Sequence, residues 1–278
     1  MNKIYFILIV TFCLVCSLII IANGSTTTTS TTTTTYWSTI DSTSTVSTTT
    51  TTSYSTIDTT STNQTTTPPS PINVEMIDSF QNGLKHTVPS LPGSQRALIF
   101  IAFCESAGTA TLNSVTYGGR PMTKIVQRSV GTPSQNYTVA FILNDANIAA
   151  ATNDTFVVSW SAAPTEVEYT HVFLKNVSQS GPTGATSSNV ATGTPNTITA
   201  PGLTSRSGDM VIAAADCGTR STYTWNNYFT KRVQYQLPTS TATAATKKGA
   251  GISETASVSF YGPFNQQVLI GFVVRLSN

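Results

Sequence analysis

The sequence predicts an all-β fold: an antiparallel, jelly-roll-like β-sandwich over residues 72–278, built from two related halves and preceded by a disordered stalk. Two observations lead to this prediction. Short apolar runs alternate with clusters of Gly, Pro, Asn and Ser, without sustained helical periodicity. The domain also matches itself in order along its length, which indicates an internal duplication.

The strongest strand signals are predominantly apolar runs at residues 97–103, 210–215 and 268–276. Residues 155–160 and 257–261 alternate in the way of half-buried strands. Because the three apolar runs have no polar face, both of their faces should be buried. We therefore expect the two halves to pack into one sandwich.

The duplication rests on matches at a constant offset. Residues 152–160 align without gaps on residues 252–260, and residues 169–175 align on residues 269–275 at the same offset. Chance similarity does not preserve both order and spacing, so the matches favour a repeated unit.

A cysteine marks the same place in each half. The apolar run ending in Cys104 parallels the run ending in Cys217, and the half-domains extend over about 72–178 and 186–278. An even pair of cysteines in an exported domain predicts a Cys104–Cys217 disulfide. Two buried free thiols are the alternative.

Each half also carries a turn signal. Gly118-Gly119 corresponds to Asn226-Asn227, and both pairs tolerate positive φ at successive positions. A two-residue type I′ hairpin requires this conformation, because its twist matches the strands that it joins.

Aromatic residues cluster at these turns. Tyr117 and Trp225 precede the two turns, with Tyr223 and Tyr228 nearby, and we take these four as candidate ligand contacts. Exposed amphipathic rings serve as anchors for sugars or proteins. Packing across the strands is the alternative.

The N-terminus has the features of a signal peptide over residues 1–24. Lys3 precedes an apolar run over residues 4–22, and small residues then predict cleavage before Ser25. An uncleaved membrane anchor is the alternative, since the run approaches a spanning length. Either outcome exports the rest of the chain, to an extracellular or cell-surface location.

Residues 25–71 predict a stalk. From Ser25 to Thr67, 33 of 43 residues are Ser or Thr, a composition that is typical of O-glycosylated spacers and does not form a packed core. The segment 68–71, Pro-Pro-Ser-Pro, adds a semi-rigid joint. Sequons for N-glycosylation occur at Asn63, Asn136, Asn153 and Asn176.

Three segments of the domain resemble a known type of module: residues 112–123 (LNSVTYGGRPMT), 207–215 (SGDMVIAAA) and 267–275 (QVLIGFVVR). The domain is similar to β-sandwich modules of about 200 residues in secreted and surface proteins of microbes, which often occur in large modular chains. The resemblance implies a surface or adhesion context. It brings no catalytic residues with it.

Signals for catalysis or metal binding are weak. The chain has only two histidines, His86 and His171, and no Gly-x-Ser-x-Gly motif. Glu166 and Glu168 share one strand face, as exposed acidic residues at sheet edges often do. The segment 144–147 offers oxygens for a structural calcium but lacks the rest of an EF-hand loop. We therefore predict no enzyme, no catalytic or metal residues and no cofactor.

The small number of charged residues limits the kinds of partner that we expect. Charged residues make up 9% of the chain, and the basic pairs at 231–232 and 247–248 are too few for nucleic acid. We expect a cell-surface, glycan or protein partner, or self-association, with membrane contact only through an uncleaved leader. The favoured function is a non-enzymatic surface or secreted glycoprotein for adhesion or assembly. The alternatives are a carbohydrate-binding module, and a structural subunit of a filament, envelope or virion.

Overall fold

The computed structural model describes residues 19–22, 25–28, 73–89, 95–193, 196–262 and 265–277. The chain divides into two compact units, Met1–Asn63 and Gln64–Asn278. In the first, β1 (Ile19–Ala22) and β2 (Ser25–Thr28) form an antiparallel pair. Apart from these strands, the predicted leader and stalk lie outside the described residues. Within the described part of the chain, no helix is long and apolar enough to cross a membrane.

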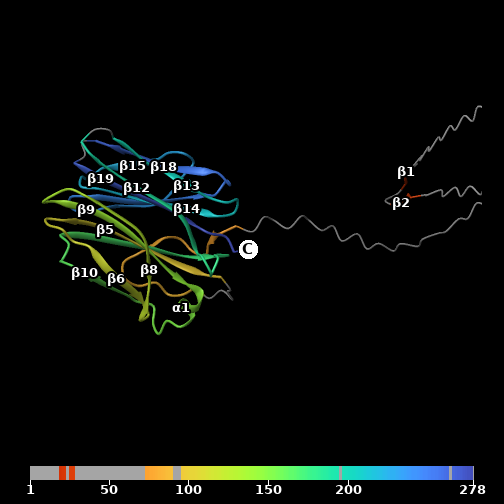
Figure 1. Ribbon diagram of the computed structural model, residues 1–278, viewed down its shortest axis with the longest axis horizontal. Helices are drawn as coiled ribbons and strands as arrows, with labels where there is room; N and C mark the ends of the chain where they lie inside the picture. The colour runs from red at the N-terminus through yellow and green to blue at the C-terminus, as the bar shows by residue number, and fades with distance from the viewer. Residues whose placement is uncertain are drawn as a thin grey trace, which may run out of the picture. The chain divides into compact units, whose positions relative to one another are not determined.

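The second unit confirms the predicted all-β antiparallel class (Figure 1). In its first half, the larger sheet has the order β3-β11-β5-β9-β8, with β4 also paired to β11, and the smaller sheet has the order β10-β6-β7. The strands are β3 (Glu75–Met76), β4 (Gln81–Asn82), β5 (Ala97–Ser106), β6 (Leu112–Tyr117), β7 (Arg120–Pro121), β8 (Thr123–Val130), β9 (Gln135–Asn144), β10 (Phe156–Trp160) and β11 (Glu166–Lys175).

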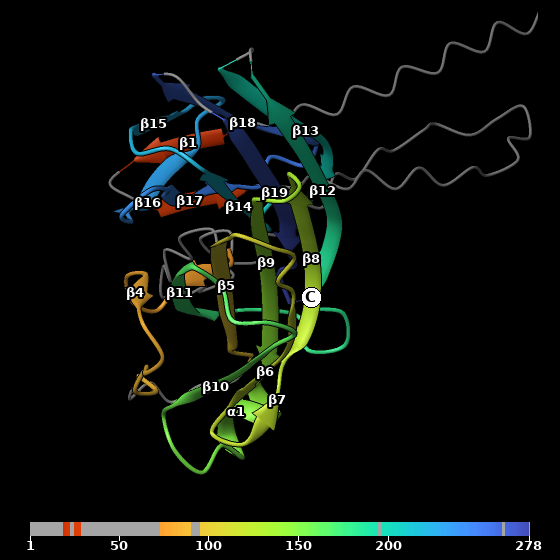
Figure 2. The ribbon, with the colours of Figure 1, turned by 90° about the vertical axis from the view of Figure 1, so that its left-hand side faces the viewer.

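The second half repeats this plan. Its larger sheet has the order β12-β19-β14-β17-β16, and its smaller sheet has the order β13-β18-β15. The strands are β12 (Thr183–Thr192), β13 (Thr197–Thr204), β14 (Met210–Cys217), β15 (Thr222–Trp225), β16 (Thr230–Gln236), β17 (Thr241–Lys248), β18 (Ser253–Tyr261) and β19 (Gln266–Val274). A short helix, α1 (Asp145–Ala149), belongs to the first half and lies at its far end in Figure 2.

Both halves are jelly rolls. In the second half, the first strand (β12) pairs with the last (β19), and the second strand (β13) pairs with the penultimate one (β18). This nested pairing is what two Greek keys produce. The first half repeats it, because β3 and β4 pair with β11, and Lys85 forms a bridge to Thr155 beside β10.

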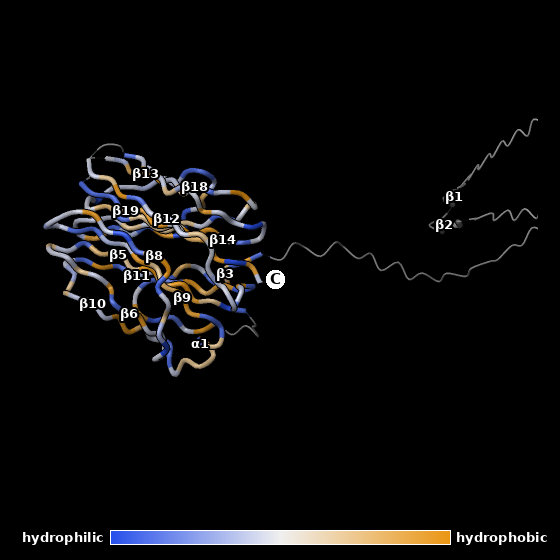
Figure 3. The backbone as a smooth tube through the Cα atoms, viewed as in Figure 1, coloured by the Kyte–Doolittle hydropathy of each residue, from blue (hydrophilic) through white to orange (hydrophobic). Residues whose placement is uncertain are grey.

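The halves pack through their larger sheets. Residues of β5 alternate between two cores: Ile99 and Ile101 join β14 and β19 in a core shared by both halves, whereas Leu98 and Phe100 face the smaller sheet of their own half. The runs of apolar residues in Figure 3 follow these central strands. The unit therefore has four layers, two sandwiches joined face to face, rather than the one sandwich expected from the sequence.

The first predicted turn is confirmed. Gly118 and Gly119 have φ values of 54° and 77° and connect β6 to β7, with Tyr117 paired to Arg120. Glycine at position 118 also meets a spatial requirement, because a Cβ there would lie 2.5 Å from the Asn153 carbonyl oxygen.

Candidate binding site

The two cysteines do not form the predicted disulfide. Cys104 on β5 and Cys217 on β14 are buried free thiols. Cys104 faces the smaller sheet of the first half and Cys217 that of the second, so the shared core separates them. The prediction was wrong because strand alternation directs the two side chains in opposite directions. Burial raises the pKa of both thiols to about 12, which keeps them protonated.

Three of the four candidate aromatic contacts are core residues. Tyr117 and Tyr223 are fully buried and Trp225 is 9% exposed. The Trp225 indole nitrogen donates to the Thr243 hydroxyl at 3.1 Å. These rings stabilise their sheets and offer no surface to a ligand. Tyr228 differs, since 92% of it is exposed.

The sequons also fall into different environments. Asn63 lies outside the described residues. Asn136 is 2% exposed, and its amide donates to Asp216 at 3.0 Å. The amide of Asn176 is partly buried and donates to the Asn73 carbonyl at 2.8 Å. The buried or engaged amides of Asn136 and Asn176 are poor acceptors for a glycan.

Asn153 has the geometry of an accessible sequon. It is exposed and lies in the loop that leads to β10. Its side-chain oxygen accepts hydrogen bonds from the backbone nitrogen and the hydroxyl of Thr155, at 3.0 and 2.6 Å. These bonds occupy the oxygen and leave the amide nitrogen, the atom that takes the glycan, without a hydrogen bond to the described residues.

The two histidines meet in a buried network that the sequence did not predict. A nitrogen of His86 lies 2.6 Å from the Asp78 carboxylate, and the Nδ1 atoms of His86 and His171 are 2.8 Å apart. Asp78 also accepts from the Phe173 backbone nitrogen, at 3.2 Å, so the network holds the segment before β5 against β11. Burial, and secondarily the charge of His86, lowers the pKa of His171 to about 4.

The acidic residues considered for catalysis have structural partners. The Glu166 carboxylate accepts from the Thr239 backbone nitrogen at 3.1 Å and from the Ser240 hydroxyl at 3.2 Å, which holds the β16–β17 loop. Glu168 lies on the same strand, and burial raises its pKa. Both belong to the contact between the two halves.

The residues considered for calcium are likewise engaged. The Asn144 side chain caps α1 by accepting from the Asn147 backbone nitrogen, and Asp145 pairs with Arg96. Among the residues that the structure describes, no group of three or more His, Cys, Asp or Glu side chains is placed to hold a metal ion.

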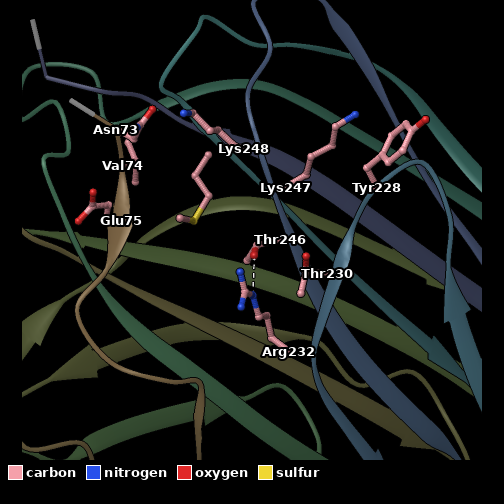
Figure 4. Close-up of a pocket in the computed structure, with 10 residues that line it drawn as sticks. Asn73, Val74, Glu75, Tyr228, Thr230, Arg232, Thr246, Lys247 and Lys248 are labelled. Carbon is pink, nitrogen blue, oxygen red and sulfur yellow. Dashed lines mark hydrogen bonds between the residues drawn. The ribbon is translucent and has the colours of Figure 1, made fainter. Parts of the chain in front are cut away.

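A pocket of about 520 Å³ lies where the two halves meet, and it brings together residues that are far apart in the sequence. Its base includes Val74 and Met210, which belong to the shared core. Its walls come from the segment around β3 and from β16, β17 and the turn before β16 (Figure 4). The remaining lining residues are polar or aromatic: Asn73, Glu75, Tyr228, Thr230, Arg232, Thr246, Lys247 and Lys248.

Tyr228 is held outward by a strained turn. The Phe229 backbone nitrogen donates to the Asn226 carbonyl at 3.2 Å, and the two central residues, Asn227 and Tyr228, have φ values of 56° and 63°. This is a type I′ turn, centred one residue later than predicted. Positive φ is uncommon for a bulky residue, and such strain often accompanies function.

Lys247 lies under the Tyr228 ring, with its ammonium nitrogen 5.7 Å from the ring centroid. The same nitrogen pairs with Glu254, whose side chain is 2% exposed and also accepts from the Ala250 backbone nitrogen at 3.2 Å. Glu254 is therefore a buried residue that anchors β18.

Two further cations face the pocket without a charged partner. The Arg232 Nε donates to the Thr246 hydroxyl at 2.7 Å, and its other guanidinium nitrogens make no hydrogen bond or ion pair with the described residues. Lys248 makes no ion pair with any residue that the structure describes. Glu75, the only carboxylate among the described lining residues, pairs with Lys175 at 2.9 Å. The pocket is thus electropositive in a chain with few charges.

In the sequence, the basic pairs at 231–232 and 247–248 are far apart. Pairing of β16 with β17 places Arg232 and Lys248 in one pocket, and the turn adds Tyr228. Comparison with family models, curated proteins and solved structures found no match for this chain. What the pocket does must therefore be inferred from its own geometry.

Proposed function

We propose that this chain is a non-enzymatic, exported surface or secreted glycoprotein, and that its jelly-roll unit is a binding module for adhesion or assembly. The pocket beside Tyr228 is the observation that carries this proposal. Its lining offers an exposed ring, cations without charged partners and hydroxyls, which suit the holding of a ligand. Its described lining residues include no His or Cys, and the one carboxylate among them, that of Glu75, is paired with Lys175.

The scaffold supports a binding role. Arg232, Thr246 and Lys248 lie on paired strands, and strands hold contact residues more precisely than loops do. The apolar leader and the Ser/Thr-rich segment support export and display at a surface.

The test uses beads coated with the full chain. Wild-type beads should bind cells or extracellular matrix, or aggregate with one another. Tyr228→Ala should weaken that binding about tenfold or more, since exposed aromatic anchors contribute strongly to binding. Tyr261→Ala is the matched control, because Tyr261 is 57% exposed and does not line the pocket. A monomeric chain that binds no cell, matrix or glycan would overturn the proposal.

A carbohydrate-binding module is the second candidate, and the exposure of Tyr228 favours it. An exposed ring can stack on the apolar face of a sugar, while the exposed hydroxyl of Thr230 can exchange hydrogen bonds with it. A glycan array probed with wild type and Tyr228→Ala distinguishes a sugar ligand from a protein ligand.

A further inference from the structure

We infer that the pocket beside Tyr228 binds an acidic saccharide, with its carboxylate or sulfate groups held by Arg232 and by Lys248 and the sugar ring against Tyr228. This inference rests on the proposed binding function and names the ligand class for the same site.

The position of Arg232 favours an anion. The register between β16 and β17 shifts between Lys231 and Val233, so Arg232 is the extra residue of a β-bulge, a device that redirects a side chain. Its hydrogen bond to Thr246 fixes the guanidinium and leaves the terminal nitrogens available to a ligand. A fixed guanidinium can hold a carboxylate or sulfate through two parallel hydrogen bonds.

Lys248 adds a second charge on the same side. Thr246 and Lys248 are two positions apart on β17 and therefore share one face of that strand. Thr230 lies directly opposite Thr246 on β16, so its hydroxyl is on this face as well. One surface thus presents two cations and the exposed hydroxyl of Thr230.

Size and shape favour a sugar over a bare ion. About 520 Å³ lies within the range that small organic ligands occupy, and it far exceeds the roughly 30 Å³ that one water takes up in the liquid. Lys247 already lies near one side of the Tyr228 ring. The rest of this highly exposed ring remains available for the C–H groups of a saccharide.

The test compares saccharides that differ only in charge, by calorimetric titration of the full chain. The probes are oligogalacturonate with its methyl-esterified form, and heparin oligosaccharide with its desulfated form. We expect at least one acidic probe to bind about tenfold more tightly than its neutral counterpart, and its affinity to fall as salt is added.

Variants connect that binding to the pocket. Arg232→Gln and Lys248→Gln should each weaken binding of the acidic probe about tenfold. Arg232→Lys should bind the probe as weakly as Arg232→Gln does, because lysine lacks the two parallel donors of the guanidinium. Arg128→Gln is the matched control, since it removes an exposed cation on β8, outside the pocket, and should change affinity less than twofold. Unchanged thermal unfolding would show that the variants remain folded.

Each remaining outcome is decisive. Equal affinity for charged and neutral probes, or binding unaffected by Arg232→Gln and Lys248→Gln, overturns the inference. Competition by inorganic sulfate at the same concentration as the saccharide overturns it too, because the site would then take only a bare anion. If coated beads bind cells but no acidic probe binds, the ligand class is wrong and the proposed function stands. If neither binds, both fail.

Discussion

Asp216 provides a strong test of how the two halves are held together. It lies on β14, is 1% exposed and faces the first half at the end of the shared core. One carboxyl oxygen accepts from the Asn136 amide at 3.0 Å, and the other, Oδ1, has no hydrogen-bond partner among the described residues. The pKa of Asp216 is raised to about 8, chiefly by burial; the hydrogen bond from Asn136 opposes the rise, and the nearby charges of Glu105 and Glu166 add to it.

The sign of the pH dependence follows from proton binding. A carboxyl whose pKa is raised from 3.8 to about 8 binds its proton more tightly when folded. Its contribution to stability is therefore complete below about pH 4 and is lost as the pH rises toward 8. One pH unit corresponds to about 1.4 kcal/mol, so the loss by pH 7 is about 4 kcal/mol. This is a large fraction of the roughly 5–15 kcal/mol that stabilises a typical domain.

The most informative interval is pH 6.5 to 8, because His171 is then neutral in the folded state and loses only its remaining half proton in the unfolded state. Over this interval the free energy of unfolding of the wild type should fall by about 2 kcal/mol. Asp216→Asn keeps the side-chain shape and cannot ionise, so its free energy of unfolding should not fall over this interval. Asp154→Asn, which replaces a partly exposed carboxylate, is the control and should keep the wild-type slope.

Denaturation by urea at several pH values, followed by fluorescence, measures these slopes. A wild type whose stability is flat from pH 6.5 to 8 would refute the reasoning. So would an Asp216→Asn variant whose stability falls as steeply as that of the wild type, because another group would then be responsible.

Three further predictions concern other buried or accessible groups. His171 has a folded pKa of about 4, against 6.5 when free, so the free energy of unfolding should fall by roughly 1.4 kcal/mol per pH unit as the pH drops from about 6.5 to 4. His171→Leu should remove that slope when unfolding is measured across the acid range. Lys247→Met leaves the Glu254 carboxylate buried and unpaired, so it should destabilise the fold by about 3 kcal/mol in urea denaturation. Adding Glu254→Gln should recover most of that loss. A Lys247→Met variant as stable as the wild type would contradict this. Mass spectrometry of the protein from a glycosylating host should find a glycan at Asn153 and none at Asn136, and the reverse pattern would contradict the burial of Asn136.

The elements that could be predicted are those set by local pattern. The long apolar runs within β5, β14 and β19 indicated strands buried on both faces, and the structure places each between two cores. The constant offset between the halves likewise anticipated the repeated strand order. Four layers were not foreseen, because apolarity on both faces shows that a strand is covered without showing which sheet covers it.

The errors arose where the orientation of a side chain decided the outcome. Cys104 and Cys217 occupy equivalent strands, but alternation directs them into separate cores. In the second turn the left-handed positions fall on Asn227 and Tyr228. Residue preference favoured the two asparagines over a tyrosine, so it could not place the centre of the turn correctly.

The pocket could not be predicted from the sequence. Its lining comes from residues 73–75, 210, 228–232 and 246–248, which only the packing of the two halves and the pairing of β16 with β17 bring together. The β-bulge at Arg232 has no local sequence signal. The one usable signal was a pair of basic dipeptides near an aromatic turn.

Hydroxyl-radical footprinting tests most directly whether the pocket beside Tyr228 is the binding site. The full chain would be oxidised free in solution and again on the cells or matrix that it binds. Tyr228 and Tyr261 are both exposed in the free chain, so both should react. We predict that binding protects Tyr228 several-fold and leaves Tyr261 unchanged. A Tyr228 that remains as reactive in the bound chain as in the free chain would contradict the account.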